Sequence, residues 1–173
     1  PLTAYPMMNL PALPANLPPE MVMALSRQES ELNPQAESRV GARGLMQLMP
    51  GTARDVSRQL GIEYSLGQLT SNPAYNIRLG TTYLSEQLAA FGGSYIMAAA
   101  AYNAGPGRPR QWAERYGDPR FMDVEEAVDW IEGIPFNETR NYVMRVLEGM
   151  HVYRQRINGR PVPLQIEQDI TAG

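Results

Sequence analysis

The sequence predicts an all-α protein with a compact helical fold. Apolar residues recur at spacings of three and four positions, which is typical of helices that bury one face. Glycine, proline and asparagine separate these segments, and no clear stretch alternates apolar and polar residues as a strand does. The chain has 173 residues, 43% hydrophobic and 19% charged, and both the length and the composition suit a single globular domain.

The predicted helices begin and end at recognisable signals. The first follows Pro18-Pro19 and stops before Asn33-Pro34. Later helices are expected to be capped by Asn72, Ser94 and Asn137, because these side chains accept hydrogen bonds from the first free amides. The expected helices cover about residues 20–30, 50–60, 73–91, 95–103, 110–116, 123–131 and 138–157.

The two ends of the chain differ from the middle. Residues 1–19 contain six prolines and are expected to form a proline-rich linker or a docked irregular arm. Residues 20–158 form the predicted helical domain. Residues 159–173 contain Pro161 and Pro163 and are expected to be a surface tail. The chain opens at Pro1 without a methionine, so we expect a fragment of a longer protein.

Composition excludes several kinds of chemistry. Without cysteine there is no thiol nucleophile, disulfide or cysteine-based zinc site, and any Ser-His-Asp triad would have to use the single histidine, His151. His151 lies late in a predicted helix, where a helix-end or surface position is expected. A net charge of −3 predicts no general attraction to nucleic acid. There is no apolar run long enough for a membrane span and no recognisable signal peptide.

One carboxylate falls on the apolar face of the first helix. Met21, Leu25 and Glu29 are spaced by four and therefore share a face, whereas Glu20 and Glu31 lie roughly opposite and are expected to face water. A carboxyl group in apolar surroundings has a raised pKa, as a general acid at neutral pH needs. The alternative is that Glu29 reaches solvent at the edge of the helix or pairs with an arginine.

Four segments together resemble soluble lytic transglycosylases. Residues 24–30 (ALSRQES) resemble the Glu-Ser motif of that family, and residues 38–47 (SRVGARGLMQ) its Gly-Leu-Met-Gln segment. Residues 101–105 (AYNAG) and 135–143 (PFNETRNYV) resemble two further family segments in the same order.

The resemblance implies a lysozyme-like domain that cuts the MurNAc–GlcNAc β-1,4 bond of peptidoglycan. It assigns to Glu29 the role of acid and then base, with the sugar's own C6 hydroxyl as nucleophile. Because that nucleophile is intramolecular, one carboxyl group suffices where most glycosidases need two. The resemblance also places the protein in the periplasm or cell envelope, with glycan strands as its partner. Nothing in the sequence implies a metal or organic cofactor.

The same motifs, together with Met49 just after the second of them, supply further candidate residues that contact substrate. Each also has a purely structural interpretation: a turn hydroxyl, a surface amide, a core filler, a core tyrosine, a helix end or a helix-end charge. A tyrosine hydroxyl near the cleaved bond would stabilise developing charge or bond the acid, and Glu138, in a first helical turn, would be a fixed charge. The candidates are Ser38, Gln47, Met49, Tyr102, Asn103, Glu138 and Tyr142.

Two other functions remain open at this point. A goose-type-like lysozyme would use water in place of the C6 hydroxyl and would need a second acid, and the sequence does not place Asp123, Glu125 or Glu126 relative to Glu29. A glycan-binding module without catalysis is the other alternative, and the apolar position of Glu29 argues against it.

Overall fold

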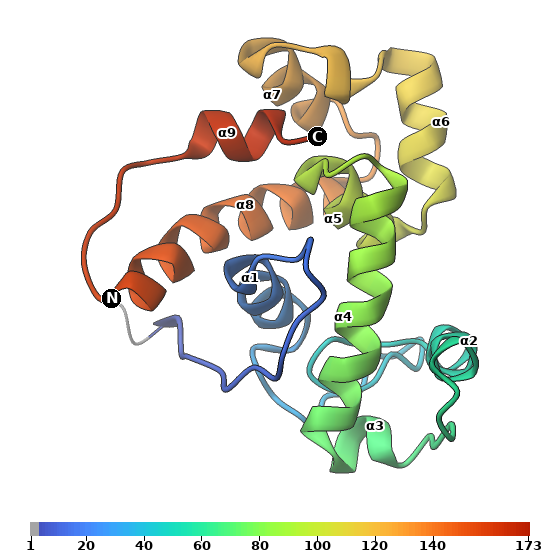
Figure 1. The fold of residues 1–173 in the computed structure, drawn as a ribbon. Helices are drawn as coiled ribbons and strands as arrows, with labels where there is room; N and C mark the ends of the chain where they lie inside the picture. Colours follow the sequence, from blue (N-terminus) through green and yellow to red (C-terminus); the bar gives the residue numbers. More distant parts are fainter. Residues whose placement is uncertain (1–3) are drawn as a thin grey trace.

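A computed structural model describes residues 4–173, and two helices form its centre. α1 (Pro19–Ser30) packs along α8 (Asn137–Asn158), and α5 (Tyr95–Ala104) packs against the same helix (Figure 1). A β-carbon added to Gly149 would lie 3.0 Å from the Ala24 side chain, so α1 and α8 approach closely because both residues are small. The all-α prediction is confirmed: within residues 4–173 only two isolated β-bridges occur, both at Arg43.

A second, smaller core lies below this centre in Figure 1. It is built by α2 (Pro50–Leu60), α3 (Gln68–Ser71) and the first half of α4 (Pro73–Ala90). Its buried residues are Leu48, Ala53, Val56, Leu69 and Leu79. The segment between α1 and α2 therefore connects the two cores, and each of its ends is held by the helix that it joins.

The opposite end of the molecule carries three further helical elements. α6 (Gly107–Tyr116), the short 3-10 helix η2 (Pro119–Phe121) and α7 (Val124–Glu132) follow one another along the chain (Figure 1). Trp112 of α6 and Trp130 of α7 meet edge to face with ring centroids 6.4 Å apart. α6 begins three residues earlier than predicted, since Gly107 and Arg108 are already helical.

Two of the three predicted caps are confirmed. Asn72 accepts a hydrogen bond from the Tyr75 amide, and Ser94 accepts one from the Met97 amide. The prediction for Asn137 is wrong: Phe136 precedes the helix and Asn137 is its first residue. The side-chain oxygen of Asn137 instead accepts a hydrogen bond from the Arg140 guanidinium, so it caps no backbone amide.

The segment before α1 lies against the domain. The Tyr153 hydroxyl donates to the Pro6 carbonyl at 2.9 Å, and Arg27 donates to the Ala4 carbonyl at 2.7 Å. The Arg27 guanidinium also lies 4.0 Å above the centre of the Tyr5 ring. No helix among residues 4–173 is both long and apolar enough to cross a membrane.

The C-terminal tail contains a helix that the sequence did not predict. α9 (Ile166–Thr171) buries Asp169 and Ile170, so the expectation of a surface tail fails there. Asp169 accepts two hydrogen bonds from Arg154 of α8, at 2.9 and 3.2 Å. Glu20 lies 3.7 Å from the same guanidinium with only 18% of its side chain exposed, so the prediction that Glu20 faces water is wrong, whereas Glu31 is exposed as expected.

Candidate active site

A pocket of about 560 Å³ opens where the end of α1, the segment before α2, the end of α5 and the start of α8 meet. All eight residues proposed from the sequence line it. Its lining residues are Gln28, Glu29, Ser38, Val40, Ala42, Gln47, Met49, Tyr102, Asn103, Glu138, Asn141 and Tyr142.

Four of these lining residues were missed in the sequence. Asn141 lies three positions after Glu138 on α8, so helical spacing alone would have placed it on the same face. Gln28 precedes Glu29 in the last turn of α1, and both side chains line the pocket. Val40 is 75% exposed at the tip of the loop, and no periodicity marks such a position.

Glu29 lies in the last turn of α1 and is largely covered by its neighbours. Burial raises its pKa from 4.5 to about 7, since a charged carboxylate loses water contacts there. The Tyr142 hydroxyl donates a 2.8 Å hydrogen bond to Glu29 Oε1, which lowers the pKa, while the nearby charge of Glu138 raises it. At neutral pH, Glu29 is therefore present in both protonation states.

Tyr102 also lies in the pocket, but its hydroxyl does not bond Glu29. Its hydroxyl donates to the Met46 carbonyl at 2.6 Å, and burial raises its pKa well above the usual value. The Tyr83 ring meets it edge to face at 5.5 Å. Among the described residues the tyrosine that hydrogen-bonds the acid is thus Tyr142, while Tyr102 ties α5 to the loop segment.

Ser38 and Gln47 stabilise the loop that carries them. Ser38 Oγ accepts a hydrogen bond from the Ala42 amide at 3.0 Å, as the turn interpretation predicted. The Gln47 amide group donates to the carbonyls of Ala36 and Gly44, at 3.0 and 2.8 Å. Gln47 has a φ of 50°, a left-handed conformation that directs its side chain back onto the loop.

Asn76 of α4 anchors the same loop from below. It is fully buried, its carbonyl oxygen accepts from the Met46 amide, and its amide group donates to the carbonyls of Arg43 and Leu69. Gly44 lies directly against it: an added β-carbon would come within 2.1 Å of the Asn76 amide nitrogen. The loop position therefore depends on a glycine at this point.

The remaining predicted residues lie around the pocket. Asn103 accepts a 2.7 Å hydrogen bond from Thr139, so the end of α5 is tied to the start of α8. Glu138 lies in the first turn of α8, and Met49 is half exposed immediately before α2. Asp123, Glu125 and Glu126 do not line this pocket, and Glu29 and Glu138 are the carboxyl groups among its lining residues.

The fold is that of a known domain class. A profile of the Transglycosylase SLT domain family matches residues 7–123. The chain belongs to the SLT transglycosylase domain family.

Individual relatives agree with this assignment. The soluble lytic murein transglycosylase of Escherichia coli K12 is 44% identical over 147 residues, which cover 84% of this chain and 22% of that protein. Among solved structures, the 70 kDa soluble lytic transglycosylase of Escherichia coli has a TM-score of 0.74 and 40% identity, covering 89% of this chain and 23% of that one. An inactive mutant of lytic transglycosylase Slt from Pseudomonas aeruginosa has a TM-score of 0.77 and 46% identity, covering 90% and 24%. The chain thus spans less than a quarter of each of these proteins.

Proposed function

We propose that this domain cleaves peptidoglycan as a lytic transglycosylase, with Glu29 as its single acid and base. One observation carries the proposal: a buried carboxyl group with a pKa of about 7 lies in an open pocket and holds a hydrogen bond from Tyr142. A group that titrates near neutral pH both donates and accepts a proton efficiently.

The proposed reaction runs in two proton transfers. Protonated Glu29 donates its proton to the oxygen of the β-1,4 bond, and the bond to the MurNAc C1 breaks. The Glu29 carboxylate then takes the proton of the C6 hydroxyl, whose oxygen bonds to C1 and gives a 1,6-anhydro ring. The carboxyl group returns to its starting state, and no water is consumed.

The Tyr142 hydroxyl supports both halves of this cycle. It donates to the carboxylate form of Glu29 and so keeps the pKa from rising further through burial. Glu138 acts in the opposite direction through its charge. We propose that these two residues set the balance between acid and base, in addition to contacting the glycan.

The other lining residues are proposed to hold the sugar. Asn103 offers an amide group for sugar hydroxyls or acetamides, and Gln47 retains a carbonyl oxygen that can accept from them. Met49 and Tyr102 present apolar surface, while Ser38 is proposed to act near the glycan through the turn it closes.

The alternative function is that of a hydrolytic lysozyme, and the presence of Glu138 in the pocket favours it. It is the one other carboxyl group among the lining residues, so it is the candidate for activating water. A non-catalytic binding module is the third candidate, against which the raised pKa of Glu29 argues.

Mass spectrometry of the fragments released from purified peptidoglycan tests the proposal. Fragments ending in 1,6-anhydro-MurNAc are expected, and their loss in a folded Glu29→Gln variant that still binds peptidoglycan would assign the acid. Fragments heavier by one water would establish the hydrolase instead. No fragments from folded protein would overturn the enzymatic proposal.

We also propose that the protein works in the cell envelope, in the periplasm. Murein is the substrate named for its relatives, and one relative in Klebsiella pneumoniae is named as a membrane-bound lytic murein transglycosylase. The chain matches less than a quarter of the length of the Escherichia coli soluble lytic transglycosylase, which supports the proposal that it is part of a larger protein.

A further inference from the structure

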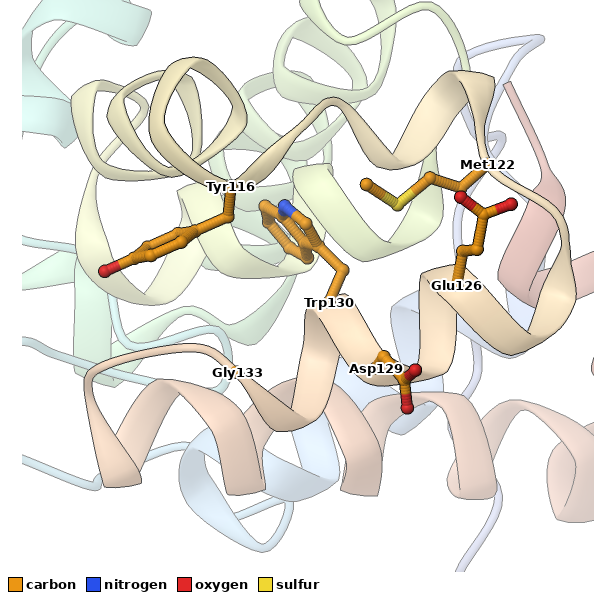
Figure 2. A pocket seen from close by; sticks show the side chains of 6 residues that line it. All are labelled: Tyr116, Met122, Glu126, Asp129, Trp130 and Gly133. Atoms are coloured by element: carbon orange, nitrogen blue, oxygen red, sulfur yellow. The ribbon is translucent and has the colours of Figure 1, made fainter.

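A second pocket, of about 360 Å³, lies at the far end of the domain between α6 and α7. It shares no lining residue with the pocket around Glu29. Figure 2 shows the side chains that line it: Tyr116, Met122, Glu126, Asp129 and Trp130, with Gly133.

The pocket contains an unpaired donor. Trp130 is 6% exposed, and its indole nitrogen is buried with no hydrogen-bond acceptor among the described residues. A buried donor without an acceptor destabilises the folded state, so such a group calls for an explanation. In Figure 2 the indole nitrogen lies between Tyr116 and Met122.

The Met122 side chain lines the same pocket as Trp130. The Met122 methyl group would lie 2.8 Å from a β-carbon added to Gly117, so the thioether occupies space that glycine leaves free. A methionine side chain is flexible and its sulfur is only a weak acceptor. For a ligand in the pocket to accept from the indole N–H, the Met122 side chain has to rotate away from it, which a flexible thioether side chain allows.

The other polar groups of the pocket are acceptors. The carboxylates of Glu126 and Asp129 are both exposed, and in the described part of the chain neither side chain takes part in an ion pair or accepts a hydrogen bond. Tyr116 adds an aromatic ring that stays 48% exposed, although the Arg115 guanidinium lies 5.5 Å over it.

These groups favour a ligand that both donates and accepts hydrogen bonds. An indole N–H needs an acceptor and carboxylates need donors, so the ligand must offer both. An ammonium group offers donors alone and would leave Trp130 unpaired. An N-acetylhexosamine offers an acetamide carbonyl, several hydroxyl donors and an apolar ring face that can pack on Tyr116.

We propose that the α6–α7 pocket is a second glycan-binding site, which holds an N-acetylhexosamine of the strand through Trp130, Tyr116 and the α7 carboxylates. The choice of an N-acetylated sugar rests on the proposed function, since peptidoglycan is the glycan such an enzyme meets. A site outside the catalytic pocket would keep the domain on the strand between cleavage events.

The test uses the two tryptophans of the chain as reporters. In ¹⁵N-labelled Glu29→Gln protein, which cannot cleave, the indole signals of Trp112 and Trp130 are assigned with Trp130→Phe. Titration with N,N′-diacetylchitobiose is expected to shift the Trp130 signal in a saturable way. Tyr116→Ala should raise the Kd read from that signal about fivefold.

Two matched controls separate the pocket from its surroundings. Phe121 is 87% exposed nearby but does not line the pocket, so Phe121→Ala should leave the Kd unchanged. Glu126→Ala should weaken binding where Glu125→Ala, one residue earlier on α7, should not.

The outcomes distinguish this proposal from the proposed function. An unmoved Trp130 signal, or equal effects of Tyr116→Ala and Phe121→Ala, would overturn the second site even if wild-type protein releases anhydro fragments. A saturable Trp130 shift that Tyr116→Ala weakens would support the site even if no cleavage were found.

Discussion

The Tyr142 hydroxyl donates a 2.8 Å hydrogen bond to Oε1 of Glu29, and so joins two residues 113 positions apart in the sequence. The contact exists because α1 and α8 pack along each other. It opposes the effect of burial on Glu29, whose pKa is about 7. Two substitutions on α8 should therefore move this pKa in opposite directions.

Tyr142→Phe removes the donor and keeps the ring. The carboxylate of Glu29 loses its hydrogen bond, so its pKa should rise by about one unit. Because the acid form then persists to higher pH, the alkaline limb of the pH profile of kcat/KM should move upward. Tyr64→Phe, which lies outside the pocket, is the control. An unshifted limb would show that the hydrogen bond does not tune the acid.

Glu138→Gln should move the same limb downward. The Glu138 charge raises the pKa of Glu29, so its removal makes the carboxylate easier to form. The shift should be smaller than that of Tyr142→Phe, since the charge has the smallest of the three effects on Glu29. Glu148→Gln, further along α8 and exposed, should leave the profile where it is. An upward shift in Glu138→Gln would contradict this account.

The raised pKa of Glu29 also predicts a dependence of stability on pH. The folded state binds the Glu29 proton more tightly than the unfolded state, so the contribution of Glu29 to stability is greatest below about pH 4.5 and is lost as the pH rises through about 7. The loss amounts to about 3 kcal/mol once both states are ionised. Glu29→Gln should remove it, so the variant should gain on wild type in urea unfolding at pH 8 but not at pH 4. Glu31→Gln, at an exposed position, should show no such difference.

Gly44 and Gly41 form a matched pair in the loop. Both have positive φ, 81° and 96°, so alanine is strained at either position. A β-carbon at Gly44 would also meet Asn76 and the Leu69 carbonyl at 2.1 Å, whereas nothing lies within 4 Å at Gly41. Gly44→Ala should cost at least about 2 kcal/mol more than Gly41→Ala in thermal unfolding. Equal losses of stability in the two variants would mean that the loop shifts to accommodate the β-carbon without disturbing its hydrogen bonds to Asn76.

The buried Arg154 should hold the C-terminal helix in place. Arg154→Met leaves Asp169 and Glu20 without their partner, which should cost about 3–5 kcal/mol. Hydrogen exchange should become faster in α9 before it does so in α1. Arg145→Met, at an exposed position on α8, is the control and should change neither quantity.

Local patterns in the sequence predicted most of the helices, the family and eight of the twelve residues that line the pocket around Glu29. Spacings of three and four placed Glu29 with Met21 and Leu25 on an apolar face, and the four motifs named the partners that line the pocket with it. Local signals were sufficient for Asn72 and Ser94, because a capping hydrogen bond spans only three residues. They failed for Asn137, whose side chain accepts instead from Arg140.

Which of these side chains contact one another depends on how the helices pack. The choice of Tyr142 over Tyr102 as the partner of the acid depends on how α8 and α5 approach α1, a relationship that no local pattern encodes. The helix α9 is too short to show a periodicity, and it is fixed by the pairing of Asp169 with Arg154. The unpaired Trp130 indole likewise follows from the packing of α7 against α6, because hydrogen-bond satisfaction is a property of the folded neighbourhood rather than of the residue.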